Sequence, residues 1–374
     1  MENLEDTSVI NWMKEQNEYT HKILNQFPIN EELYNRMHEI ANLSQAIIGS
    51  VSHRAGRFFF IKILQEDEIG KLYYREGLDG EDILLIAPDQ FKPEGAASAS
   101  INYYEPSHDG KLVAFGISVD GSEDAILRII DVDHKRLYDE EIDRAMIGNP
   151  VWLPDNQSFF MNRLQDPGAD PDPGKFYLDS EAYMHIVDTD PDEDRLLLSR
   201  KSCPDLGFIP SDFPIIFECD AEHDIMMAAA VHGVQKELTL FLAPLSARNK
   251  QKINWEKICF TDQKVTDCDL LDGNLFYITY KDAPKYKLCK VPLKDPDFNN
   301  QHIILPEEEA VLEYFSIASD AIYTQSMLAG LGIIKRIPHG QTDQILKIDL
   351  PVQGNISFVD NDKEKEGILF SLTS

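Results

Sequence analysis

Serine, histidine and carboxylate side chains are the groups in this sequence that could carry out nucleophilic catalysis, provided that their spacing allows it. A serine nucleophile at a strand-to-helix elbow needs the pattern G-x-S-x-G, because glycines on both sides let the strained turn form. No segment matches this pattern, since Gly116-Ile117-Ser118 is followed by Val119-Asp120. A triad also needs a histidine that a carboxylate orients beside the serine. We therefore assign no catalytic residue and expect no such catalysis from this chain alone.

The acids at alternate positions between Asp188 and Asp194 come closest to a metal site. A calcium loop of this type needs glycine at its sixth position and glutamate at its twelfth, where Glu193 and Ser199 stand. We interpret the segment as a solvated turn between two strands. Three histidines stand alone, without the spacing of metal ligands: His185, His302 and His339. The sequence also has no glycine-rich phosphate loop, so we expect neither a metal nor a cofactor.

Short apolar strands separated by polar turns must position any site in this chain. The stretch SHDGKLVAFGISVDGSEDAILRIIDVD, which begins at Ser107, alternates turn residues with the apolar runs LVAFGIS and AILRIIDV. Asp-Gly turns between runs of β-branched and aromatic residues are typical of a β-meander. One meander cannot bury both of its faces, so it needs neighbours of the same kind.

Turns of this kind recur along the whole chain. They are His53–Gly56, Asp109–Gly110, Pro154–Gln157, Asp220–Asp224, Asp272–Asn274, Ser319–Asp320 and Asp360–Glu366. Four-stranded blades that repeat about every 40 to 67 residues are typical of a β-propeller. Seven turns predict an all-β fold, a seven-bladed β-propeller over residues 46–374. We expect the last blade to be incomplete, because the chain after Asn355 has room for two strands only.

Residues 1–45 have a helical pattern and form a separate N-terminal segment in this interpretation. Thr7 or Ser8 can cap a first helix, which Pro28 ends. The apolar residues of this helix follow helical spacing: Val9, Trp12, Met13, Tyr19, Ile23 and Phe27. A second helix is predicted from Asn30 or Glu31 to about Asn42. Such an amphipathic pair must pack against another apolar surface.

The composition excludes several classes of partner. A formal net charge of −30 and a pI of about 4.6 oppose binding to nucleic acid or to an anionic membrane. No apolar run approaches the roughly 18–20 residues of a membrane-spanning helix, and no signal peptide is visible. The five cysteines lack any CxxC spacing, which favours free thiols in a reducing compartment. We expect a cytoplasmic location, or a periplasmic one if a longer precursor carried a signal.

Several segments resemble the prolyl oligopeptidase family of serine peptidases. LEDTSVINWMKEQNEYTHKIL is similar to the N-terminal helix of that family. The stretch from Ser107 described above resembles a blade of its propeller, as do VWLPDNQSFFMNRL, LGFIPSDFP and VHGVQKELTLFLAPL. The resemblance extends in collinear order over essentially the whole chain.

The resemblance implies a propeller whose central tunnel lies over an α/β-hydrolase domain and limits by size the peptides that reach it. It also implies cleavage of short peptides after proline, and residues 1–45 that pack on the hydrolase domain. By motif match, Phe160 in SFFMN stands where the family places an aromatic residue of the substrate pocket. Val234, after His232-Gly233, lies near another apolar lining position. For both residues the alternative is an ordinary structural position. An arginine that some members carry before this glycine is absent, with Val231 or His232 in its place.

We expect the sequence to depart from the family in lacking the hydrolase portion, since it contains no G-x-S-x-G elbow. Our leading hypothesis is the non-catalytic, substrate-gating half of a prolyl oligopeptidase-like enzyme. Its partners would be short proline-containing peptides and a hydrolase domain, in cis or as a separate chain. The alternative is a free-standing propeller that binds a peptide or protein in its central funnel.

Overall fold

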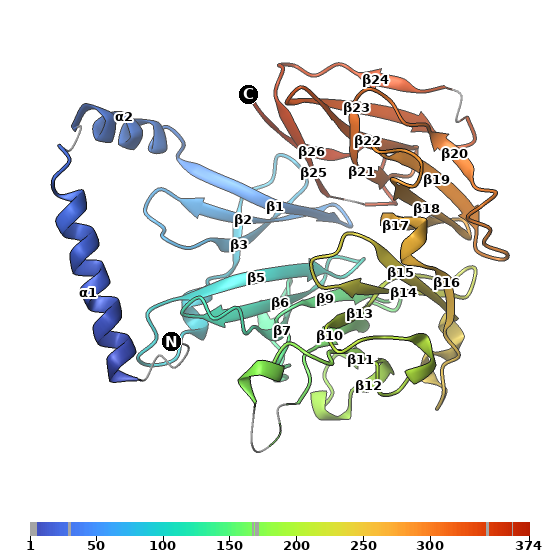
Figure 1. Ribbon diagram of the computed structural model, residues 1–374, viewed down its shortest axis with the longest axis horizontal. Helices are drawn as coiled ribbons and strands as arrows, with labels where there is room; N and C mark the ends of the chain where they lie inside the picture. Colours follow the sequence, from blue (N-terminus) through green and yellow to red (C-terminus); the bar gives the residue numbers. More distant parts are fainter. Residues whose placement is uncertain (1–5, 29–30, 167, 169–171, 342–343, 361) are drawn as a thin grey trace. The chain divides into compact units, whose positions relative to one another are not determined.

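Six four-stranded antiparallel sheets follow one another along the chain in the computed structural model (Figure 1). The structure describes residues 6–28, 31–166, 168, 172–341, 344–360 and 362–374. Within each sheet the strands pair in chain order, so each sheet is a meander with its first strand at one edge. The first strands of the second to sixth sheets contact one another in succession. They surround a common axis, which makes the sheets the blades of a β-propeller.

The strands of the first three blades are β1 (Ala46–Arg54), β2 (Arg57–Leu64), β3 (Lys71–Glu76), β4 (Ile83–Ile86), β5 (Ala99–Pro106), β6 (Leu112–Val119), β7 (Ile126–Asp131), β8 (Arg136–Leu137), β9 (Gly148–Trp152), β10 (Ser158–Arg163), β11 (Glu181–Ile186) and β12 (Arg195–Leu198). The next three blades contain β13 (Asp212–Asp220), β14 (Ile225–His232), β15 (Leu238–Pro244), β16 (Glu256–Cys259), β17 (Val265–Leu271), β18 (Asn274–Thr279), β19 (Lys287–Pro292), β20 (His302–Leu305), β21 (Val311–Ile317), β22 (Ala321–Leu328), β23 (Leu331–Pro338) and β24 (Leu346–Ile348).

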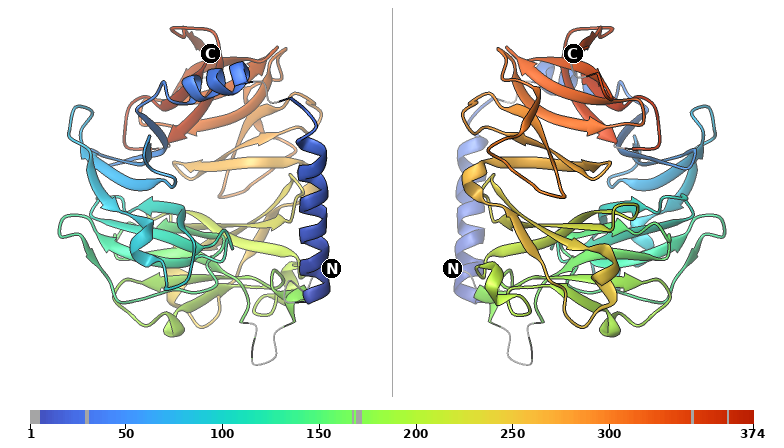
Figure 2. Two further views of the ribbon diagram at one scale, coloured as in Figure 1. Left: turned by 90° about the vertical axis from the view of Figure 1, so that its left-hand side faces the viewer. Right: turned by 90° about the vertical axis from the view of Figure 1, so that its right-hand side faces the viewer.

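The prediction of seven blades is wrong. The last segment forms only β25 (Asn355–Asp360) and β26 (Leu369–Thr373), a two-stranded hairpin that we call the C-terminal hairpin. This hairpin lies between the sixth blade and the first (Figure 1 and Figure 2). The turn signal at Asp360–Glu366 specifies only the two strands that flank it and not a sheet of four. The propeller therefore has six blades.

Two helices precede the propeller, α1 (Thr7–Leu24) and α2 (Glu31–Ala41). The cap of α1 is Asp6, whose carboxylate accepts a hydrogen bond from the Ser8 amide at 2.8 Å, and not Thr7 or Ser8. Chain contacts define two compact units, one of Met1–Ile47 with Leu64–Asp67 and the other of the remaining residues. None of the described helices is both long and apolar enough to cross a bilayer.

The apolar core is divided into six clusters. Each cluster lies between two successive blades, or between the sixth blade and the C-terminal hairpin. Because both faces of a blade pack against neighbours, its central strands are apolar without alternation. All six residues of β10 are buried, and so are the first six of β14. This packing explains why runs such as IMMAAAV and SFFMN lack the period of two that marks a half-exposed strand.

The two ends of the propeller differ in the connections that they carry. Antiparallel pairing places the turns between first and second strands at one end, which we call the turn face; residues 107–111 and 221–224 are examples. The links between successive blades, such as residues 199–211 and 260–264, lie at the other end, together with the turns between second and third strands. We call that end the connecting face.

Tyr103 fills a space that two glycines leave open between the second and third blades. Its hydroxyl donates a hydrogen bond to the Ala145 carbonyl at 2.6 Å. A Cβ atom on Gly116 would lie 2.4 Å from the Tyr103 ring, and one on Gly148 would lie 2.1 Å from the hydroxyl oxygen. Gly148 also has a φ of +51°, in the left-handed region that favours glycine.

We expect Gly148→Ala to lower the free energy of unfolding by about 2–4 kcal/mol, because it combines overpacking with an unfavourable φ. Two matched variants separate these causes. Gly116→Ala isolates the clash with Tyr103, because the φ of Gly116 is ordinary. Gly121→Ala isolates the unfavourable φ of +69°, because a Cβ atom there would meet no other atom within 4 Å. Urea unfolding of the three variants provides the measurement. A Gly148→Ala variant no less stable than Gly121→Ala would contradict the packing argument.

Candidate functional site: the central channel

A cavity of about 500 Å³ opens along the propeller axis, where four inner strands meet. Its walls come from β1, β5, β21 and β25, with Ile61 of β2. Serine, tyrosine and charged side chains line it together with apolar ones such as Ile101 and Phe358. A cavity of this size with mixed walls is suited to a small ligand or a short peptide segment.

Arg54 organises one side of the channel. Its guanidinium lies 2.8 Å from Glu105 Oε1 and 3.2 Å from Asp360 Oδ1, and so joins the first blade to the second blade and to the C-terminal hairpin. Burial raises the pKa of both Glu105 and Asp360, although the charge of Arg54 opposes that shift. Arg54 therefore compensates the buried carboxylate of Asp360 and the half-buried carboxylate of Glu105.

His53 strengthens the junction of the first blade with the C-terminal hairpin, and Tyr104 strengthens that between the first and second blades. His53 donates its amide hydrogen to Asp360 Oδ2 at 3.0 Å, and its ring nitrogen Nδ1 lies 2.6 Å from Asp362. The Tyr104 hydroxyl contacts the carbonyls of Ser50 and Phe59, the latter at 3.0 Å. The junction between the first blade and the C-terminal hairpin is thus polar, in contrast to the apolar clusters elsewhere.

A second group of charges lies at the turn-face end of the channel. Lys363, which follows β25, contacts Glu218 of β13 and lies 2.5 Å from Asp269 of β17. Tyr314 lines the cavity, and burial together with the charges of Asp267 and Asp269 raises its pKa to about 12. The cavity and this acidic group are therefore parts of one channel.

Asp267 is held in an unfavourable setting for a carboxylate. Burial, and then the charge of Asp269, raise its pKa to about 7. A folded-state pKa above the unfolded value of about 4 means that the folded chain binds this proton more tightly. The contribution of Asp267 to stability is therefore lost as the pH rises from about 4 to 7.

We expect Asp267→Asn to remove this loss. Between pH 4.5 and pH 8 the natural chain should lose about 1–3 kcal/mol of unfolding free energy relative to the variant. Urea unfolding at both pH values measures the difference, with Asp79→Asn on an exposed turn as the control. A stability gap between the Asp267 variant and the natural chain that stays constant with pH would contradict the prediction.

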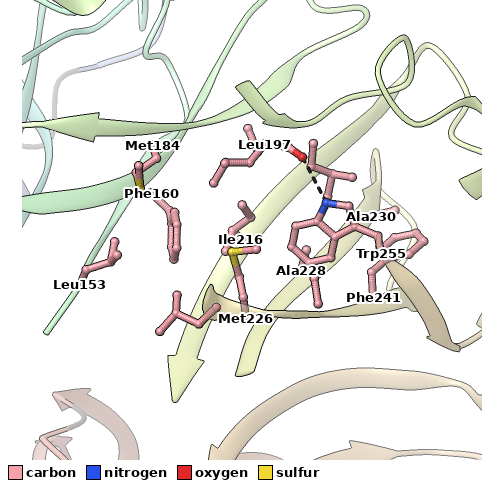
Figure 3. Close-up of a cluster of buried hydrophobic side chains, with 14 of the residues drawn as sticks. Leu153, Phe160, Met184, Leu197, Ile216, Met226, Ala228, Ala230, Phe241 and Trp255 are labelled. Carbon is pink, nitrogen blue, oxygen red and sulfur yellow. Dashed lines mark hydrogen bonds between the residues drawn. The ribbon is translucent and has the colours of Figure 1, made fainter. Parts of the chain in front are cut away.

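The structure places Phe160 and Val234 in different surroundings. Phe160 of β10 is 0% exposed in the cluster between the third and fourth blades, near Leu153, Met184 and Met226 (Figure 3). Val234 lies fully exposed in the turn between β14 and β15, on the connecting face. The fold does not bring the two together in the channel, and their substrate-lining role stays a prediction.

A trio that sequence reasoning missed lies beside Val234. His232 Nδ1 is 2.7 Å from Asp212 Oδ1, and its Nε2 is 2.9 Å from the hydroxyl of Thr239. Asp212 and His232 are direct cross-strand partners, so the contact follows from strand register. Thr239 is only 7% exposed. The trio therefore fixes the orientation of His232 at the end of β14.

Three of the four alternating acids that the sequence placed in a solvated turn are exposed, and only Asp194 is half-buried. Asp194 accepts a hydrogen bond from the fully buried His185 at 2.7 Å, and His185 also lies 3.7 Å from Glu140. These carboxylates outweigh the effect of burial and raise the pKa of His185. The solvated-turn interpretation is thus wrong for Asp194 alone, because the turn between β11 and β12 folds this residue back onto His185. Among the described residues, no group of three or more His, Cys, Asp or Glu side chains could hold a metal ion.

Comparison with known proteins identifies the family of this propeller. The family model described as the prolyl oligopeptidase N-terminal β-propeller domain matches residues 1–374. The chain belongs to that family. A prolyl endopeptidase from Elizabethkingia meningoseptica is 23% identical over 376 residues, which cover 99% of this chain and 50% of the relative. Prolyl oligopeptidase A from Amanita bisporigera is 22% identical over 347 residues, which cover 82% of this chain and 42% of the relative.

Solved prolyl oligopeptidase structures have the same fold. A prolyl endopeptidase structure superimposes with a TM-score of 0.83 at 21% identity. The superposition covers 100% of this chain and 53% of the endopeptidase chain. Prolyl oligopeptidase B from Galerina marginata, bound to a 35-residue hydrolysis and macrocyclization substrate, gives a TM-score of 0.81 at 16% identity. The prolyl oligopeptidase propeller described here spans about half the length of these relatives.

Proposed function

We propose that this chain is the substrate-gating, non-catalytic half of a prolyl oligopeptidase-like serine endopeptidase. In this role it acts on short proline-containing peptides together with an α/β-hydrolase domain, supplied in cis or as a separate chain. The propeller channel admits extended, narrow peptides and excludes folded proteins. The hydrolase domain supplies the nucleophile that the sequence of this chain lacks.

The observation that carries the proposal is the uneven distribution of exposed apolar side chains over the propeller. On the connecting face, five connections each present a large apolar residue that is at least half exposed: Tyr177, Ile209, Val234, Phe260 and Val352. On the turn face, Leu78 is the comparable residue among the described connections, and Leu346, which is also more than half exposed, begins β24 at that end. An excess of exposed apolar side chains at one end of the ring favours a docking surface there. The expected occupant is the hydrolase domain, because the named relatives are peptidases about twice as long as this chain.

Complementation tests the proposal. We would measure hydrolysis of a chromogenic Gly-Pro substrate by the chain alone, and by the chain co-expressed with the hydrolase portion of the Elizabethkingia meningoseptica relative. We expect no turnover alone and measurable turnover by the pair. Phe260→Glu and Val234→Glu should weaken the pair, whereas Leu78→Glu on the turn face is the matched control.

Two outcomes would contradict the proposal. The first is turnover by the chain alone that a serine-directed phosphonate inhibits. The second is a folded pair, verified by circular dichroism, that shows neither association nor turnover. The free-standing scaffold is then the remaining candidate, which the 500 Å³ channel cavity favours. Binding of proline-containing peptides to the chain alone would support that role.

A further inference from the structure

A second cavity, of about 400 Å³, lies on the turn face between the first blade and the C-terminal hairpin. We call it the seam cavity. Of its lining residues only Asp360 also lines the channel cavity, so the two are distinct. The turns after β1, β3 and β25 surround it. The Gly77 amide donates a hydrogen bond to the Gly56 carbonyl at 2.8 Å, which joins the two turns of the first blade.

The walls of the seam cavity are largely apolar, with Phe58 and Leu78 from the first blade and Ile368 and Leu369 from the hairpin. Leu78 is 70% exposed, so the cavity presents an apolar side chain that water reaches. Concave surfaces of this size with apolar walls and a few polar groups are typical of sites for small molecules.

The charges of the seam cavity are balanced. Asp360 is paired with Arg54, and Asp362 is paired with His53. Lys365 and Glu366, which are both exposed, contribute opposite charges. The cavity therefore suits a ligand without net charge, in contrast to the acidic surface of the rest of the chain.

His53 is the polar group that points to a ligand. Only 8% of its side chain is exposed, and its Nδ1 lies 2.6 Å from Asp362 Oδ2. A carboxylate only accepts hydrogen bonds, so Nδ1 carries the proton and Nε2 of the neutral ring is an acceptor. Among the described residues Nε2 has no hydrogen-bond partner, although His53 lines the cavity. An acceptor withdrawn from bulk water and left unpaired is costly. A donor bound in the cavity would remove that cost.

We propose that the seam cavity binds a neutral aromatic molecule that carries a hydroxyl or N–H donor, such as a phenol. The donor reaches Nε2 of His53, and the ring packs against Phe58 and Leu78. The rings of His53 and Phe58 have centroids 4.6 Å apart and planes tilted by 55°, which offers both a face and an edge to a third ring.

A ligand in this position bridges two parts of the ring. His53, Phe58 and Leu78 belong to the first blade, whereas Asp362, Ile368 and Leu369 belong to the hairpin. Binding should therefore slow amide hydrogen exchange in residues 362–369. The site lies at the end of the propeller opposite the connecting face and does not depend on the proposed hydrolase domain.

Titration of the full chain with 4-ethylphenol at pH 8, followed by ligand-observed NMR, tests the site. The matched probe is 4-ethylanisole, which keeps the ring and the ethyl group but replaces the hydroxyl hydrogen with a methyl group. We expect 4-ethylphenol to bind at least about fivefold more tightly, the effect of one hydrogen bond. N-acetyltyrosinamide distinguishes the source of the phenol. Its tighter binding would indicate a tyrosine side chain of a peptide, and weaker binding a free phenol.

Variants link the binding to the cavity. His53→Phe keeps an aromatic ring and removes Nε2, so it should bind both ethyl probes equally. His223→Phe is the matched control, because His223 Nδ1 also lies 2.8 Å from a carboxylate, that of Asp220, but outside this cavity. Leu78→Ala should weaken both probes about threefold, even if His53→Phe proves too unstable to titrate. Val234→Ala, on the connecting face, should bind as the natural chain does.

Equal affinity of the natural chain for 4-ethylphenol and 4-ethylanisole would overturn the role of His53 as acceptor. Binding that neither His53→Phe nor Leu78→Ala changes would place the probe elsewhere and overturn the site. The absence of saturable binding up to the solubility limit of 4-ethylphenol would do the same. No hydrolase domain is present in these titrations, so their failure would leave the complementation result intact, and failed complementation would leave the seam cavity intact.

Discussion

Phe160→Ala is expected to lower the free energy of unfolding by about 3–5 kcal/mol. The Phe160 ring is completely buried between the third and fourth blades, so its removal loses the transfer free energy and leaves a cavity. Urea unfolding followed by circular dichroism provides the measurement. The substitution also decides between the two roles considered for Phe160, since a residue that lines an open pocket loses much less stability.

Phe160→Leu is the control for this experiment. It keeps the site apolar and nearly filled, and should cost less than about 1.5 kcal/mol if the neighbours repack. A Phe160→Ala variant as stable as Phe160→Leu would show that the ring does not contribute to the core. If both variants keep their stability but lose peptidase activity in the complemented pair, the pocket-lining role would be established.

Arg54→Met is expected to cost about 3 kcal/mol of unfolding free energy at neutral pH, because it leaves the buried Asp360 and the half-buried Glu105 without their cation. The loss should shrink as the pH falls. Burial already raises the pKa of both acids, and without Arg54 these pKa values rise further, so that protonation in acid restores neutrality. Urea unfolding at pH 7.5 and at pH 4.5 measures both effects.

Arg200→Met provides the matched comparison. Arg200 pairs with Asp179 on the surface, where 38% of its side chain is exposed, and its loss should leave stability nearly unchanged at both pH values. If Arg54→Met is equally harmless, the ionic junction between the first blade and the C-terminal hairpin is not needed to hold the ring.

Local sequence signals predicted the strands and turns well because those signals act over a few residues. Asp109-Gly110 and Asp272–Asn274 both mark hairpin turns of the structure, as the turn pattern indicated. The number of blades was not predictable in the same way. Whether a hairpin gains a third and fourth strand depends on the chain that follows it, and the turn signal at Asp360–Glu366 contains no such information.

The contacts that line the channel could not be predicted from local sequence patterns for a different reason. The contacts of Arg54 with Asp360 and of Lys363 with Glu218 join residues 306 and 145 positions apart. In a chain of 65 acidic and 35 basic residues, pattern alone cannot select the pairs that meet on the axis. Phe160 was identified by motif, but its burial follows from the packing of both blade faces, which a strand pattern does not reveal.

The ring has six apolar interfaces and one ionic interface, and these respond to different solvents. Urea weakens apolar packing, whereas salt screens exposed ion pairs and strengthens apolar burial when the anion is strongly hydrated. Blades that contact mainly their neighbours behave as a linear array, in which the weakest interface sets where opening starts. Because Arg54 and Asp360 are largely buried, salt should screen their junction only weakly, and acid that protonates Asp360 should loosen it first. Urea and sulfate act instead on the six apolar interfaces, so pH and solvent composition together become a means of separating opening of the ring from unfolding of its blades.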